Sequence, residues 1–406
     1  MNSSRAFKIS EKGEKENKMR VLVVDDSVVF RSQISAALGG IPGVVVAGTA
    51  PNGSIALQKL SQLSVDLVTL DVEMPDQDGI QVLKEIRKAG FPVRVIMFSS
   101  QTSRGADKTL EALVSGADDF VAKPGGAGLT PENAPEVIRQ ALMPKVMQFM
   151  RESGAGASGF QGETAPTSAS GSLFSVPSVS TSQVETRRPF ATSQAPATVS
   201  QSRSVMLETF IPDVIVIASS TGGPAALDLV FSQIQGPVGV PILIAQHMPP
   251  VFTASLAKRL GDVTGIPSRE AKNGEVLSAN QIYVAPGDFH LSIEGIWPGI
   301  VKTKLDQAPQ RNSVRPAADY LFEAAAKVFG RKCMGVVLTG MGEDGCVGAQ
   351  AIKDAGGAIM IQNQESCVVF GMPGAVHRLG LFDGQGTPAE IGGCLKRMAW
   401  RNGKGG

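Results

Sequence analysis

The stretch LVTLDVEMPDQDG, residues 67–79, decides the fold of the N-terminal part of the chain. It joins a short apolar run to Asp71 and then to a turn rich in Pro, Asp and Gly. Such a run, without polar alternation, is typical of a parallel strand buried on both faces. Similar runs lie at Val21–Val24, Val44–Ala47, Val93–Phe98 and Asp118–Val121, separated by amphipathic stretches such as Ser54–Leu63 and Gly79–Ala89. This β-α repeat predicts a small, doubly wound α/β domain over residues 19–137.

Polar residues stand where four of these predicted strands end. They are Asp25 and Asp26, Asp71, Ser99, and Lys123. Parallel α/β sheets place their ligands at the carboxyl ends of the strands, so we expect these side chains to converge. Three carboxylates repel one another unless a cation joins them, and hard oxygen ligands suit Mg²⁺. A carboxylate can also act as a nucleophile toward a phosphoryl group, whose charge a lysine then offsets.

Each of these residues also has a simpler interpretation. Asp25 and Asp26 precede an amphipathic stretch and could cap a helix, and an isolated lysine is usually a solvated surface residue. Asp76-x-Asp78-Gly79 is best read as a turn, since the further ligands of an EF-hand are missing. The shared position at strand ends favours a functional site over these separate interpretations.

This set of residues resembles a response-regulator receiver domain over about residues 19–137. The matching motif is an acidic pair, a single Asp before x-x-M-P-x-x-D-G, a Ser or Thr, and a Lys-Pro. The resemblance implies a flavodoxin-like (βα)5 fold in which Asp71 is the phosphoacceptor. It implies that Asp25, Asp26 and Asp71 bind Mg²⁺, and that Ser99 and Lys123 contact the phosphoryl group.

The chain divides into further regions by composition. Residues 1–18 are polar and carry no apolar core of a signal peptide, so we expect a disordered N-terminus. Residues 138–208 continue a helical pattern that begins at Glu132 and then become rich in Ser, Thr, Ala, Gly and Pro from Glu152 to about Val205. Such a segment cannot bury enough apolar surface to offset its ordering entropy, so we expect a flexible linker.

Strand and helix patterns resume over residues 209–402. The expected strands are Asp213–Ala218, Val240–Ala245, Gln281–Ala285, Met334–Thr339 and Ala358–Ile361, and helices are expected to begin at Gly222, Val251, Ala317 and Cys346. This alternation predicts a second, larger α/β domain, doubly wound and mostly parallel.

Three segments of this second domain carry chemistry. In VIVIASSTGGP, residues 214–224, a strand runs into a turn with Ser220, where a helix opens and its free N–H groups favour an oxyanion. His247 follows a strand and precedes a Pro-rich turn, and Asp344 follows the strand before TGMGEDG, residues 339–345. All three can reach one rim of the sheet. A nucleophile, a base and an orienting carboxylate are what acyl transfer requires.

The glycines at 340, 342 and 345 also match the G-x-G-x-x-G fingerprint of dinucleotide-binding folds. That interpretation requires an acidic residue at the end of the next strand, where the chain has Gln362-Asn363. A nicotinamide-dependent oxidoreductase therefore stays a weaker alternative. Another is a regulator whose output domain only binds a partner. A DNA-binding output is disfavoured because no helix-turn-helix pattern is present.

The segments SSTGGP, QHMP and TGMGxDG behind a receiver resemble the chemotaxis response-regulator protein-glutamate methylesterases and glutamine deamidases over about residues 209–400. The resemblance implies Ser220 as nucleophile, His247 as general base and Asp344 as orienting acid. It also implies the backbone N–H of Met341 as an oxyanion donor. The chain departs from the family pattern in two places. Ala218-Ser219 replaces Gly-Ala before the nucleophile, so Ser219 is a second candidate, and Glu343 replaces Asn before Asp344.

The resemblance implies hydrolysis of glutamate γ-methyl esters with no cofactor in the esterase domain. Its implied partners are methyl-accepting chemotaxis receptors as substrates and a chemotaxis histidine kinase as phosphodonor. Composition agrees, since 38 basic against 37 acidic residues give a net charge of +1, which argues against a nucleic-acid partner. No apolar stretch is long enough for membrane insertion, and the four cysteines form no C-x-x-C. We therefore expect a cytoplasmic protein with reduced thiols.

Overall fold

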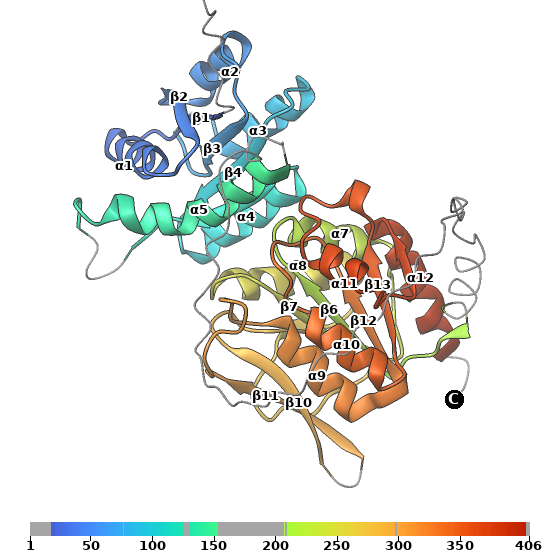
Figure 1. The fold of residues 1–406 in the computed structure, drawn as a ribbon. Helices are drawn as coiled ribbons and strands as arrows, with labels where there is room; N and C mark the ends of the chain where they lie inside the picture. The colour runs from blue at the N-terminus through green and yellow to red at the C-terminus, as the bar shows by residue number, and fades with distance from the viewer. Residues whose placement is uncertain are drawn as a thin grey trace, which may run out of the picture.

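The computed structural model describes residues 18–75, 77–125, 130–152, 207, 209–296 and 299–402, without the side chains of 399–402. Within these residues the chain forms two α/β units (Figure 1). The predicted disordered N-terminus and the Ser- and Pro-rich linker lie almost wholly outside the described residues.

The first unit has the predicted alternation of strands and helices. Its elements are β1 (Met19–Val24), α1 (Val28–Gly39), β2 (Val44–Ala50), α2 (Gly53–Gln62), β3 (Leu67–Asp71), α3 (Gly79–Lys88), β4 (Arg94–Ser99), α4 (Ser103–Val114), β5 (Asp119–Ala122) and α5 (Ala134–Glu152). The strands pair in parallel in the order β2-β1-β3-β4-β5. Every residue of β3 is buried, as expected for a central strand covered on both faces.

Helix α5 crosses the predicted domain boundary. The boundary at residue 137 falls inside this helix, which begins at Ala134 and continues to Glu152. Its apolar residues at 138, 142, 146 and 149 are buried in one cluster with α1 and one face of β1. These residues recur at helical spacing, so the helix completes the receiver layer rather than beginning a linker.

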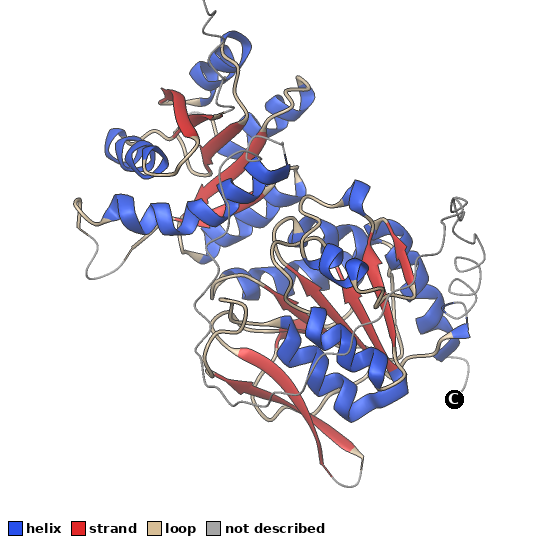
Figure 2. Ribbon diagram, viewed as in Figure 1, coloured by secondary structure: helices blue, strands red, loops and turns tan. Residues whose placement is uncertain are grey.

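The second unit is larger. Its elements are β6 (Val214–Ser219), α7 (Gly223–Ser232), β7 (Ile242–Gln246), α8 (Phe252–Thr264), β8 (Ser268–Glu270), β9 (Ile282–Val284), β10 (His290–Ile296), β11 (Ile300–Asp306), α9 (Ala318–Phe329), β12 (Cys333–Val337), α10 (Cys346–Asp354), β13 (Ala358–Gln362), α11 (Met372–Arg378), β14 (Gly384–Gly386) and α12 (Pro388–Asn402), with short 3-10 helices at Gly330–Lys332 and Gln364–Ser366. Figure 2 shows the strands as one sheet with a separate hairpin, β10–β11, beside it.

The order of the strands decides where a site can form. Seven strands pair in parallel in the order β14-β13-β12-β6-β7-β9-β8. After β6 the chain adds strands on one side and later returns to add β12 on the other side. The gap between β6 and β12 is therefore the topological switch point, outside which α/β sheets place their sites.

Alternate residues of the strands feed two cores. Val214, Val216 and Ala218 of β6 pack with α9, α10 and α11 on one face, and Ile215 and Ile217 pack with α7, α8 and α12 on the other. This period of two is the side-chain alternation of an extended strand.

Candidate functional site

The structure brings Asp25, Asp26 and Asp71 together at the carboxyl end of the receiver sheet. Carboxylate oxygens of the three residues lie within 4.8 Å of one another. The Lys123 ammonium lies 2.8 Å from an Asp71 oxygen and 3.1 Å from an Asp25 oxygen. One ammonium offsets only part of three negative charges, so the cluster retains an attraction for a cation.

Burial raises the pKa of Asp71 to about 6. The hydrogen bond and the charge of Lys123 act in the opposite direction, while the charge of Asp25 adds to the rise and the backbone N–H of Glu73 opposes it. Asp71 is only 2% exposed, so hydration cannot stabilise its charge and neighbouring groups must do so. A set of three closely spaced carboxylates fits a hard divalent cation such as Mg²⁺.

Ser99 ends β4 as expected, but its hydroxyl does not face the acidic cluster. The side chain is buried, and its Oγ donates a hydrogen bond to the carbonyl oxygen of Gly105 at 3.0 Å. The next residue, Ser100, has its Oγ 3.1 Å from the Glu73 carboxylate. A phosphoryl contact through Ser99 requires its rotamer to change, and it stays a prediction.

In the second unit, the turn after β6 separates the two candidate serines. Ser219 is buried, and its Oγ donates to Oε1 of Gln246 at 2.6 Å. Ser220 is partly exposed, and its backbone N–H donates to the carbonyl of Thr339. Gln246 also donates from Nε2 to the carbonyl of Ser220 at 3.0 Å, which fixes the turn. The buried Ser219 hydroxyl therefore supports the turn, and the geometry favours Ser220 as the nucleophile.

His247 and Asp344 lie side by side. Nε2 of His247 is 2.7 Å from Oδ2 of Asp344. An ionised carboxylate can only accept, so Nε2 carries the proton and Nδ1 is left as the acceptor of the ring. Among the residues that the structure describes, the Ser220 hydroxyl has no hydrogen bond to His247. Such contacts often tighten only when substrate binds.

Asp344 stays ionised despite its burial. Burial alone would raise its pKa, but the hydrogen bond and charge of His247 and two backbone N–H donors hold the pKa below its usual value. The two donors are the amides of Ala318 and Asp319, at 2.6 and 3.1 Å, where α9 begins. The positive end of the helix dipole adds to this stabilisation. Asp344 can therefore orient His247 and stabilise its protonated form.

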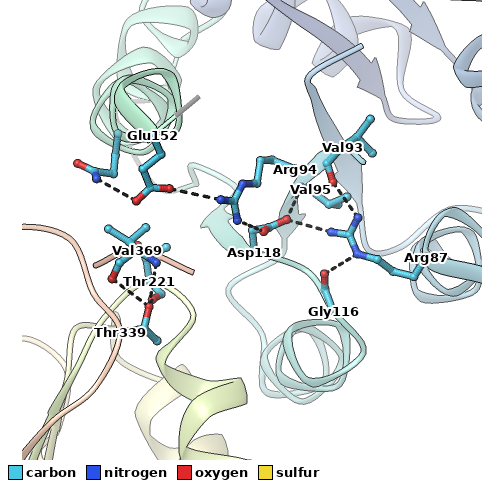
Figure 3. A network of polar contacts seen from close by, with 11 residues as sticks. Arg87, Val93, Arg94, Val95, Gly116, Asp118, Glu152, Thr221, Thr339 and Val369 are labelled. Carbon is cyan, nitrogen blue, oxygen red and sulfur yellow. Dashed lines mark hydrogen bonds and ion pairs between the residues drawn. The ribbon is translucent and has the colours of Figure 1, made fainter. Parts of the chain in front are cut away.

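The loop after β12 approaches Ser220 closely. A Cβ at Gly340 would lie 2.7 Å from Cβ of Ser220 and 2.4 Å from Sδ of Met372, so only glycine fits. Thr339 ties the loop down, because its Oγ1 donates to the carbonyl of Thr221 and accepts from the amide of Val369, as Figure 3 shows. Within the described residues the amide of Met341 has no partner, so it is free to donate to an oxyanion.

These contacts also explain the glycine fingerprint without a dinucleotide. Gly340 is required by its approach to Ser220, while Gly342 and Gly345 have φ of +84° and +87°, where a side chain is strained. The buried thiol of Cys346, just after this loop, has a raised pKa because of burial and the nearby charges of Asp319 and Glu343. A raised pKa keeps the thiol protonated and unreactive.

The receiver contacts the second unit beside this site. Helix α4 packs against α7 and α8, and the ring centroids of Phe120 and Phe252 lie 4.6 Å apart. Asp119 of β5 accepts a hydrogen bond of 2.6 Å from Oγ1 of Thr221, the residue after Ser220. The same carboxylate pairs with Lys145 of α5 at 2.7 Å. A hydrogen bond thus links the receiver directly to the turn that carries Ser220.

The loop after β12, residues 338–345, which would be the oxyanion loop of an esterase, is part of the same contact. Met341 and Val368 pack against the apolar cluster of the receiver that contains α5, and Val369 is buried in it. On the receiver side, Figure 3 shows Arg94 paired with Asp118 and Glu152, which holds the end of α5 to the sheet. These interface residues were not predicted, because a local sequence pattern carries no signal for a contact between separate domains.

Comparisons with known proteins agree with both domains. The family model described as CheB methylesterase matches residues 215–395, and that of the response regulator receiver domain matches residues 21–130. A protein-glutamate methylesterase/protein-glutamine glutaminase of Nocardioides sp. is 40% identical over 382 residues, covering 94% of this chain and 96% of that protein. One of Trichodesmium erythraeum is 40% identical over 368 residues, covering 90% and 95%.

One solved structure is also similar to this chain. The crystal structure of the Thermotoga maritima CheB methylesterase catalytic domain covers 46% of this chain and 98% of its own, at 40% identity and a TM-score of 0.44. No helix in the described part of the chain is both long and apolar enough to span a bilayer. On its near full-length identity to the curated relatives, the chain belongs to the protein-glutamate methylesterase/protein-glutamine glutaminase family, with a receiver domain before a CheB methylesterase domain.

Proposed function

We propose that this protein is a phosphorylation-activated serine hydrolase that removes methyl groups from glutamate γ-methyl esters of chemoreceptors and deamidates receptor glutamines. The observation that carries the proposal is the hydrogen bond between His247 and Asp344 at the carboxyl end of the sheet, where the turn with Ser220 and the loop with Met341 also follow strands. Each group has a role in acyl transfer, and the relatives are named for this activity. We also propose that the protein acts in the cytoplasm.

The reaction follows from the roles of these groups. Oγ of Ser220 attacks the ester carbonyl carbon while Nδ1 of His247 takes its proton, and the amide of Met341 donates to the developing oxyanion. His247 returns the proton to the leaving oxygen, which departs as methanol. Water then attacks the acyl-enzyme with His247 again as base, restoring Ser220 and releasing the glutamate side chain. A glutamine side chain would follow the same path and release ammonia.

Control by the receiver follows from the interface. In the unphosphorylated form the receiver touches the nucleophile turn through Thr221 and the oxyanion loop through Met341. Asp71 would accept a phosphoryl group from a chemotaxis histidine kinase. Asp25, Asp26 and Asp71 would hold Mg²⁺, which offsets the charge of the phosphoryl group. Phosphorylation would shift the population toward a form in which the two domains separate.

Methanol release from a methylated receptor fragment tests the proposal. We expect wild type to release methanol, faster with Mg²⁺ and a small phosphodonor, and Asp71→Asn to keep the basal rate without the activation. No release by wild type under either condition would contradict the esterase. Equal activation of wild type and Asp71→Asn would contradict the role of Asp71 alone.

Phe120→Ala is expected to raise the activity of the unphosphorylated protein about tenfold. The change removes an aromatic pair between the two domains. If this destabilises the closed form, in which the domains are in contact, by about 1.4 kcal/mol, the ratio of closed to separated protein falls tenfold. Initial rates of methanol release without phosphodonor measure this. Leu60→Ala is the control, because Leu60 is equally buried but lies on α2, away from the catalytic domain (Figure 1). Equal rates for the wild type and both variants would contradict the proposal that the unphosphorylated receiver restrains the catalytic domain.

Mg²⁺ affinity is expected to fall as the pH drops below about 6. The raised pKa of Asp71 means that a proton competes with the cation there, so affinity should weaken about tenfold per pH unit below that value. Calorimetric titrations at pH 7.5 and pH 5 measure the difference, and Asp71→Asn should lack this step. An affinity that is the same at both pH values would contradict the assignment of Asp71 to the cation.

A further inference from the structure

Asp344 and a second buried carboxylate, Asp319, cap each other's helices. Asp344 precedes α10 and accepts the amides of Ala318 and Asp319 at the start of α9. Asp319 lies in the first turn of α9 and accepts the amide of Gly348 in the first turn of α10, at 2.8 Å. Both residues are 1% exposed. These reciprocal hydrogen bonds join the N-termini of α9 and α10 next to His247, which contacts Asp344.

Two buried carboxylates so close repel each other. Burial raises the pKa of Asp319, the charge of Asp344 raises it further, and the amide of Gly348 and the charge of Arg311 oppose the rise. Asn312 stands between the two groups. Its Nδ2 donates one hydrogen to Oδ1 of Asp344 and the other to Oδ2 of Asp319, each at 3.1 Å. A single amide group thus bridges the two carboxylates.

This amide also completes the surroundings of Asp344. One oxygen of Asp344 accepts from Nε2 of His247 and the backbone amide of Ala318. The other accepts from the backbone amide of Asp319 and the side-chain amide of Asn312. These four contacts match the about four acceptor positions of a carboxylate. The backbone of Asn312 has a φ of +54°, a left-handed conformation that Asn tolerates better than most residues. In this backbone conformation the side-chain amide of Asn312 contacts both Asp344 and Asp319.

We infer that Asn312 is a positioning residue of the esterase, which fixes the Asp344 carboxylate on Nε2 of His247 by bridging it to Asp319. This inference rests on the proposed function. A loss of the bridge weakens the orientation and the stabilisation of the protonated imidazole, which matter in the transition state and not in substrate binding. The effect therefore belongs in kcat and not in KM.

Two variants of Asn312 in the full-length protein test the inference. Asn312→Gly keeps the backbone unstrained and lets water replace the amide, so kcat should fall about tenfold. Asn312→Asp keeps the shape but adds an acceptor between two carboxylates, so kcat should fall further, about 50-fold. KM should change less than about twofold in both. Ser313→Gly is the backbone control, because Ser313 has a φ of +61° and, within the described residues, forms no hydrogen bond to either carboxylate, so it should retain the wild-type rate.

A second readout does not depend on activity. The proton between Nε2 of His247 and Asp344 should give a low-field proton NMR signal, assigned by its loss in His247→Gln. We expect the signal to move or broaden in both Asn312 variants and to stay in Ser313→Gly. If wild type lacked esterase activity but the NMR signal changed in both Asn312 variants and not in Ser313→Gly, the proposed function would fail. The role of Asn312 in positioning Asp344 on His247 would still be supported. If kcat and the signal of both Asn312 variants matched Ser313→Gly, the inference would be overturned.

Discussion

Replacing Ser220 with Ala is expected to lower kcat on the order of 10⁴-fold or more, because no other group can then form the acyl-enzyme. His247 and the amide of Met341 remain, so substrate binding and a small electrostatic contribution to the rate should survive. The measurement is methanol release from a methylated receptor fragment under phosphorylating conditions, where the closed form does not limit the rate. KM should stay close to the wild-type value.

Ser219→Ala is the matched control. Ser219 donates to Gln246 inside the fold, so its loss should cost about 1 kcal/mol of unfolding free energy while kcat stays within a few-fold of wild type. Thermal unfolding measures the first effect and methanol release the second. If Ser219→Ala lost all activity and Ser220→Ala kept it, the assignment of the nucleophile would be reversed.

Gly340→Ala should lower kcat about a hundredfold or more. The new Cβ would lie 2.7 Å from Cβ of Ser220 and 2.4 Å from Sδ of Met372, so the nucleophile or the oxyanion loop must move. A misplacement of about 1 Å at a catalytic group costs on the order of a hundredfold in rate. Steady-state kinetics with the methylated fragment measure the loss.

Gly393→Ala controls for the general effect of adding a methyl group. Its Cβ would meet only the guanidinium of Arg397, at 3.7 Å, on helix α12. We expect wild-type rates and an unchanged or slightly raised melting temperature, since Ala favours a helix interior over Gly. Wild-type kinetics in Gly340→Ala would show that the loop does not press on Ser220.

The positions of the chemical groups could be predicted because they follow strands. Short runs of Val, Ile and Leu marked the strands, and the residues after them, Asp25, Asp71 and His247, had to lie at the carboxyl edge of a parallel sheet. The resemblance already implied Ser220 as the nucleophile, and the hydrogen bond of Ser219 to Gln246 inside the fold supports that choice. The sequence alone did not show that β6 ends at Ser219.

What escaped prediction depends on contacts between distant residues. Hairpin β10–β11 has mixed burial and gave no clear pattern of period two. Asn312 stands in a loop, and its role arises only when the starts of α9 and α10 meet. The sequence analysis assigned residues 138–152 of α5 to the linker region. Their helical pattern alone does not show that they pack against α1 in the receiver core.

The most direct test of the account is to locate the covalent intermediate. The protein is mixed with methylated receptor fragment, Mg²⁺ and a phosphodonor, quenched in acid within one turnover, and digested for mass spectrometry. The account predicts a glutamyl ester on Ser220 that appears together with methanol and is absent from Ser220→Ala. Methanol released with no adduct in wild type, or with the adduct on Ser219, would contradict it.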